Sequence, residues 1–149
     1  MFLTCVAALS LAISDPTTQP SFDDTVTPPA HQVVVFYFHR TERCPTCKRV
    51  GGMVEEAVAQ IFPKELKSRS VEFWMVDFQD KRNAELAKSY HIQGPTLVLA
   101  NVFDRQVKEW TPMPKIWQFV GKPDEMRSYI EEGVKHYLQR TQKEAENRK

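Results

Sequence analysis

Two cysteines with two residues between them are the part of this chain best suited to chemistry. They are Cys44 and Cys47, in the stretch 43–48, Arg-Cys-Pro-Thr-Cys-Lys, which follows a polar loop and opens a helix-period segment. Residues three apart on a helix have Cβ atoms about 5–6 Å apart, and a disulfide needs about 3.5–4.5 Å. A small adjustment therefore closes the ring, and the spacing predicts a pair that switches between dithiol and disulfide without unfolding the chain.

The two cysteines are predicted to have different roles. Cys44, at the helix amino terminus, faces unpaired backbone N–H groups that favour a thiolate, and Arg43 and Lys48 add positive potential. We expect Cys44 to attack a client disulfide and Cys47 to resolve the mixed disulfide that results. Because a stabilised thiolate favours the reduced form, the couple is expected to be more oxidising than a cytosolic reductase.

Two other functions remain open for the same residues. The pair could belong to a non-catalytic module that uses its groove to bind a partner. It could also handle copper, since two thiolates and the imidazole of His39, five residues before Cys44, would suit a soft ion. Zinc is disfavoured because one cysteine pair, with no second pair or spaced histidine pair, supplies too few ligands.

Length and composition describe one globular domain. The chain has 149 residues, 42% apolar and 26% charged, with a net charge of +1. Such a balance does not favour nucleic acid as a partner, because no excess of one charge sign is available. We expect a monomer without a cofactor, whose partners are protein thiols or disulfides and a redox partner protein.

The amino-terminal region predicts export. Residues 1–14 are apolar and uncharged, as in a secretory leader, and we expect no other membrane segment. A Pro/Thr-rich linker is predicted over 15–30, a folded domain over 31–140 and a charged tail over 141–149. Removal of the leader would take away Cys5 and leave the Cys44/Cys47 pair alone. The expected location is periplasmic or otherwise extracytoplasmic.

Hydrophobic patterns predict the order strand, helix, strand, helix, strand, strand, helix. The run 33–38 is apolar without alternation, which is typical of a strand buried on both faces. The remaining strands are expected over 71–78, 96–100 and 106–110, and the helices over 47–62, 80–90 and 123–138. With right-handed crossovers, we expect the first three strands to be parallel and the fourth antiparallel.

Two adjacent glycines stand in the first predicted helix. Each of Gly51 and Gly52 costs roughly 1 kcal/mol relative to Ala in a helix. One explanation is close packing against a neighbouring element. The other is a smooth surface for a partner near the cysteines.

At this level the chain resembles the thioredoxin-like superfamily, and the small exported bacterial members in particular. The likeness covers about 32–138 and is carried by the element order, by Cys44-Pro45-Thr46-Cys47, and by Gly94-Pro95-Thr96 before the third strand. It implies an α/β fold with a central mixed sheet of about four strands flanked by helices. It also implies a thiol–disulfide oxidoreductase with Cys44 and Cys47 as the redox-active pair.

The resemblance also implies a substrate surface. Pro95 would be cis and would face the cysteines, and Gly94 before it would offer backbone hydrogen bonds to an extended client. Pro45 and Thr46, between the cysteines, are assigned to the same surface. This chain departs from the family where Gly94 directly precedes Pro95, and where Phe36 stands near the position of a buried acid.

Overall fold

The computed structural model describes residues 26–141, 143–144 and 147. The leader predicted over 1–14 and the first part of the linker, 15–25, lie outside the described residues, as does most of the predicted tail. Within the described part of the chain, no helix is long and apolar enough to cross a membrane.

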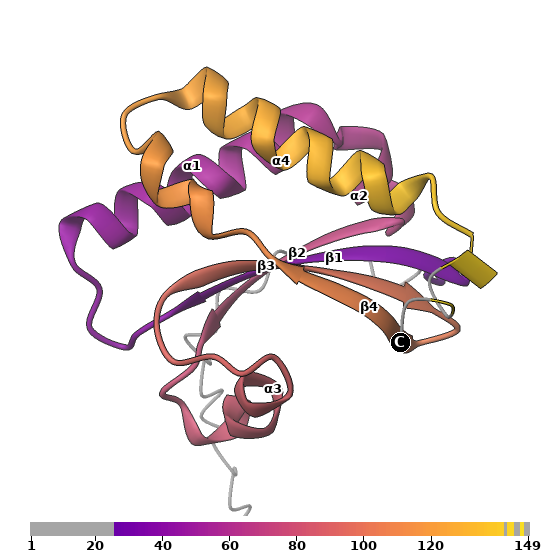
Figure 1. Cartoon of the computed structure of the whole chain (residues 1–149), viewed down its shortest axis with the longest axis horizontal. Coiled ribbons are helices and arrows are strands. Elements are labelled where there is room, and N and C mark those ends of the chain that lie inside the picture. Colours follow the sequence, from indigo (N-terminus) through magenta and orange to yellow (C-terminus); the bar gives the residue numbers. More distant parts are fainter. Residues whose placement is uncertain (1–25, 142, 145–146, 148–149) are drawn as a thin grey trace, which may run out of the picture.

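Four strands and four α-helices make up the domain, with two short 3₁₀ helices (Figure 1). In chain order they are β1 (His31–His39), α1 (Pro45–Ile61), α2 (Pro63–Ser68), β2 (Val71–Asp77), η1 (Lys81–Asn83), α3 (Ala84–Ser89), β3 (Thr96–Phe103), β4 (Gln106–Pro112), η2 (Pro114–Phe119) and α4 (Pro123–Leu138). The predicted order is confirmed, with α2 as an addition that the hydrophobic pattern did not indicate.

The sheet has the order β2-β1-β3-β4, so β1 is an inner strand as its unbroken apolar run predicts. β1 and β2 are parallel, whereas β3 and β4 form an antiparallel hairpin. Asp104 and Arg105 make the turn of this hairpin with φ of 49° and 62°, the backbone conformation that a two-residue type I′ turn requires.

The direction of β3 corrects the prediction. β3 runs antiparallel to β1, with Thr96 opposite Phe38, although the sequence predicted three parallel strands. β2 ends at Asp77, opposite His39, and residues 78–95, which include η1 and α3, lead from there to β3. This connection stays at the same end of the sheet, because the Asn83 side chain donates to the backbone oxygen of Asp77 at 2.9 Å and Thr96 pairs opposite Phe38. The chain therefore enters β3 from the end of the sheet at which β2 finishes.

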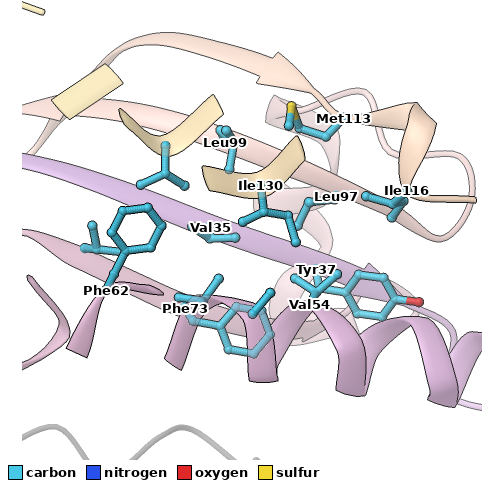
Figure 2. Packing of buried hydrophobic residues seen from close by; sticks show 14 of the residues in the cluster. Val35, Tyr37, Val54, Phe62, Phe73, Leu97, Leu99, Met113, Ile116 and Ile130 are labelled. Atoms are coloured by element: carbon cyan, nitrogen blue, oxygen red, sulfur yellow. The ribbon is translucent and has the colours of Figure 1, made fainter. Parts of the chain in front are cut away.

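Helices α1 and α4 lie side by side over one face of the sheet, and α3 lies on the opposite face (Figure 1). The larger core fills the space between the sheet and the α1/α4 layer (Figure 2). Its fully buried members include Val35 of β1, Val54 of α1, Leu99 of β3 and Ile130 of α4. This packing fixes α1, and with it the cysteine pair at its start, on the sheet.

A smaller apolar cluster lies on the α3 face and centres on Tyr90. The Tyr90 ring is 6% exposed and packs against Phe36, Phe38 and Trp110 at centroid distances of 5.3, 5.9 and 5.4 Å. Burial raises the pKa of Tyr90 from 10.0 to about 12, because an ionised phenolate would lose its hydration there.

This raised pKa predicts a loss of stability in alkali. The unfolded chain releases the Tyr90 proton near pH 10, whereas the folded chain keeps it to about pH 12, so stability present below pH 10 is lost as the pH rises towards 12. Between about pH 9 and about pH 11, the urea midpoint should fall by more in the wild type than in Tyr90→Phe. An equal fall in both proteins would show that Tyr90 ionises freely in the folded state.

Candidate redox site

Cys44 and Cys47 form a disulfide at the start of α1, with their Cα atoms 5.1 Å apart. Cys44 is the N-cap residue, in an extended conformation with φ −65° and ψ 157°, and Pro45 follows at the first helical position. The Cys44 sulfur accepts a hydrogen bond from the backbone N–H of Cys47 at 3.1 Å. Proline at this position fits the helix start because its missing N–H would have no intrahelical partner.

The two sulfur-bearing residues differ in exposure. Cys44, Pro45 and Thr46 are exposed, whereas Cys47 is half-buried against the body of the domain. An incoming thiolate can therefore reach Cys44 more easily than Cys47. The roles of Cys44 as the attacking cysteine and Cys47 as the resolving cysteine stay a prediction.

The loop that carries Cys44 is tied to the end of β2. The Thr41 hydroxyl donates to Asp77 Oδ2 at 2.7 Å, and the Thr41 backbone N–H donates to Gln79 Oε1 at 3.1 Å. Because β2 pairs with β1, the start of the loop that leads to the cysteines is anchored to the sheet on two sides. Local sequence patterns do not indicate these contacts, since they join residues more than 30 positions apart.

His39 does not complete a metal site with the cysteines. Its Nδ1 lies 2.8 Å from the backbone oxygen of Arg40. Across residues 26–141 and the described part of the tail, no three His, Cys, Asp or Glu side chains gather where they could hold a metal ion. The copper alternative therefore gains no support from the arrangement of its predicted ligands.

The two predicted thiolate-stabilising residues take different positions. Lys48 is exposed on the first turn of α1. The Arg43 side chain instead reaches beneath the helix, where Nη1 lies 3.1 Å from the Met75 sulfur and the guanidinium carbon 5.9 Å from the centroid of the Tyr37 ring. The sequence placed a charge at Arg43 but could not show that it faces the interior.

Tyr37 is a site residue that the sequence did not reveal. It is buried between β1 and α1 (Figure 2), and its hydroxyl donates to the backbone oxygen of Cys47 at 2.9 Å. Burial raises the pKa of Tyr37, and the positive charge of Arg43 opposes this rise only in part. Phe36, the residue before it, points to the opposite face of the sheet and packs against Tyr90. The β1 residue that lies below the cysteines is therefore Tyr37, whose side chain is a neutral phenol.

Comparisons with known proteins find structural likeness only. No protein-family model matches the chain, and no curated protein matches its sequence. Among solved structures, a thioredoxin from Fasciola hepatica is similar with 21% identity and a TM-score of 0.40, over 66% of this chain and 78% of that one. Oxidised thioredoxin O2 from Arabidopsis thaliana has 14% identity and a TM-score of 0.39, over 64% and 76%.

The chain's own topology decides the fold. A parallel βαβ unit, an antiparallel hairpin and a final helix share one mixed sheet of order β2-β1-β3-β4, with the Cys44–Cys47 disulfide at the start of the first helix. The fold is thioredoxin-like.

The predicted cis-proline of this thioredoxin-like domain is not found. No peptide bond among the described residues is cis, so the Gly94–Pro95 bond is trans. Trans is the intrinsically favoured isomer of an X–Pro bond by about 0.5–1 kcal/mol, and the preceding chain turns instead at His91, which has φ of 53°. The family's backbone geometry at this proline therefore does not carry over to Pro95.

Gly94 and Pro95 nevertheless lie at the cysteine end of the thioredoxin-like sheet, since Thr96 pairs with Phe38 near the end of β1. They border a groove of about 400 Å³ beside α3, whose other described lining residues are Tyr90, His91, Ile92, Gln93, Thr96, Val98, Trp110 and Pro112. None of these comes from the cysteine loop. The structure thus places Gly94 and Pro95 at the cysteine end of the sheet without joining them to Cys44 in one pocket.

Proposed function

We propose that this protein is a thiol–disulfide oxidoreductase that exchanges disulfides with protein clients through Cys44 and Cys47. The observation that carries the proposal is the Cys44–Cys47 disulfide at the start of α1, with Cys44 exposed and Cys47 half-buried. A structural disulfide that joins positions three apart closes a very small loop and constrains the unfolded chain little. Reversible exchange gives a better reason for the pair than stabilisation does.

In the reducing direction, the Cys44 thiolate attacks one sulfur of a client disulfide. A bond forms between Cys44 and that sulfur, and the client's other sulfur leaves as a thiolate. The Cys47 thiolate then attacks the Cys44 sulfur, forms the internal disulfide and expels the client's second thiolate. Two electrons pass from the dithiol to the client, and the oxidising direction is the same sequence in reverse.

The helix start supports Cys44 as the attacking thiolate. Backbone N–H groups of the first turn and the positive end of the helix dipole favour a negative charge at the N-cap position that Cys44 occupies. The Lys48 ammonium, exposed on the same turn, adds to this potential. An anionic sulfur would accept the N–H of Cys47 more strongly than the disulfide sulfur does at 3.1 Å.

The client surface is proposed to include exposed Pro45 and Thr46, together with Gly94 and Pro95 at the same end of the sheet. Export to an extracytoplasmic compartment, expected from residues 1–14, also belongs to the proposal. Beyond the predicted leader, Cys44 and Cys47 are the cysteines of this sequence. An oxidising compartment would suit the domain because disulfides form and persist there.

Turnover of insulin disulfides by the purified protein, with dithiothreitol as the reductant, tests the proposal. We expect the wild type to accelerate the reduction well above the rate with dithiothreitol alone. Protein reduced and then alkylated at its thiols should show no acceleration. Equal rates with intact and alkylated protein would overturn the oxidoreductase proposal and favour the non-catalytic binding module.

A further inference from the structure

Arg43 carries a positive charge that no carboxylate in the described part of the chain balances. Among the residues that the structure describes, no Asp or Glu forms an ion pair with Arg43. Its Nε is buried without a hydrogen-bond partner among the described residues, and its other neighbours are neutral: Nη1 donates to the Met75 sulfur, and the guanidinium lies over the Tyr37 ring. Burying part of a cation without an anion beside it costs free energy. A negative charge near the Arg43 guanidinium would lower this cost, and within these described residues the oxidised state has none there.

Gly51 makes room for this cation. A Cβ atom at Gly51 would stand 2.5 Å from Arg43 Nη2 and 2.9 Å from Cε1 of Tyr37, both closer than such contacts allow. At Gly52, by contrast, an added Cβ would meet nothing within 4 Å. The close-packing explanation for the glycine pair therefore holds for Gly51, which packs against the Arg43 guanidinium and the Tyr37 ring.

The same cation lies within about one helical turn of Cys47. Gly51 follows Cys47 by four residues, and side chains at that spacing occupy the same helix face about 5–6 Å apart. Tyr37 links the two positions, because its ring borders the Gly51 site and its hydroxyl donates to the backbone oxygen of Cys47. In the disulfide state Cys47 carries no charge; after reduction it can become a thiolate.

We propose that Arg43 is a positioning residue that holds a cation beneath Cys47 and stabilises the Cys47 thiolate when the disulfide is reduced. The inference rests on the proposed exchange function and assigns to Arg43 a target other than Cys44. Reduction then supplies the anion that Arg43 lacks in the oxidised state. The half-buried Cys47 is thereby activated by a fixed charge, and its proton passes to solvent water.

Other charged and titratable groups near the pair do not replace Arg43. Tyr37, the sheet residue that touches Cys47, stays neutral because burial raises its pKa. Lys48 and Arg49 on α1, and Arg40 and Glu42 in the loop, are exposed, so solvent and salt screen them. Asp77 of β2 accepts a hydrogen bond from Thr41, and His39 Nδ1 lies against the Arg40 carbonyl.

Stabilising the Cys47 thiolate has a chemical consequence in the oxidising direction. There a client thiolate attacks Cys44, the Cys44–Cys47 bond breaks, and the bond electrons leave with Cys47. A leaving thiolate of lower pKa departs faster. Arg43 should therefore speed the oxidation of clients and shift the equilibrium towards the reduced form of this protein.

The Cys47 pKa, read from thiolate absorbance in a Cys44→Ser background, tests the proposal without any activity assay. We expect the pKa to lie below the free value of about 8.5 and to rise by about one unit in Arg43→Met, which keeps an apolar stem. Arg43→Lys should restore most of the lowering. Arg40→Met, which removes an exposed charge from the same loop, should change the pKa by less than about 0.3 units.

A matched glycine pair gives a second test without changing any charge. Gly51→Ala should displace the guanidinium and raise the Cys47 pKa as Arg43→Met does, whereas Gly52→Ala should leave it unchanged. Circular dichroism confirms that each variant is folded. A Cys47 pKa that is the same in Arg43→Met and Arg40→Met would overturn the inference and leave Arg43 with a packing role.

The redox equilibrium separates this inference from the proposed function. With glutathione, at a pH above both thiol pKa values, Arg43→Met should shift the equilibrium constant about tenfold towards the disulfide, or about 30 mV. An unchanged constant would overturn the role of Arg43 while the wild type still turns over insulin disulfides. Conversely, a wild type inactive on insulin would overturn the proposed function, yet the Cys47 pKa would still report on Arg43.

Discussion

Cys47→Ala, once reduced, is expected to accumulate as a mixed disulfide with insulin chains, whereas Cys44→Ser should form almost none. Cys44 is exposed at the helix N-cap and keeps its thiolate-favouring position in the first variant. Without Cys47, no internal thiolate can attack the Cys44 sulfur, so the covalent intermediate persists. In Cys44→Ser the remaining thiol is that of Cys47. Because Cys47 is half-buried, we expect its sulfur to reach an insulin disulfide far less often.

Intact-mass measurement after acid quenching reads this result directly, since each mixed disulfide adds the mass of one insulin chain. Most of the Cys47→Ala protein should carry the adduct. The double variant Cys44→Ser/Cys47→Ala is the control for reaction elsewhere in the chain. Predominant trapping by Cys44→Ser would reverse the two roles and make the half-buried Cys47 the attacking thiol. With Cys47→Ala returned to its own compartment, the same adduct would identify the clients.

The sequence predicted those features of the fold that local patterns determine. The apolar run of β1 and the helical periodicity of α1 and α4 gave element types and approximate bounds that the structure confirms. Helix α2 was missed because its six residues bury none of their side chains. Its local signals were present, since Pro63 stands at the first helical position and Glu65 lies in the first turn.

Strand direction and site geometry depended on contacts distant in sequence. The antiparallel direction of β3 is set by its pairing with β1, about 60 positions away, which hydrophobic periodicity does not reveal. At the site, the sequence identified the cysteines and the nearby charges. It could not show that Arg43 faces Met75, 32 residues away, or that Tyr37 reaches the carbonyl of Cys47. Alternation along β1 could have suggested Tyr37 over Phe36, because Val33, Val35 and Tyr37 share the α1 face.

The proposed redox exchange requires a fold that remains stable when the disulfide opens, and we expect the core between the sheet and the α1/α4 layer to supply that stability. Ile130 of α4 is fully buried there with Val35 and Leu99 (Figure 2). Ile130→Ala should lower the free energy of unfolding by about 3 kcal/mol, a large part of the 5–15 kcal/mol typical of a domain. Ser128→Ala, at an exposed position of the same helix, should change it by less than about 0.5 kcal/mol.

Urea unfolding of the oxidised and the reduced protein checks this prediction and links it to function. Because Ile130 belongs to the core and the sulfurs lie at the helix start, the two effects should add, and the loss should agree within about 0.5 kcal/mol in both redox states. A loss below about 1 kcal/mol would contradict the packing of α4 on the sheet. A much larger loss in the reduced protein alone would mean that the disulfide, and not this core, holds α1 in place, and a pair that holds the fold together could not open freely during exchange.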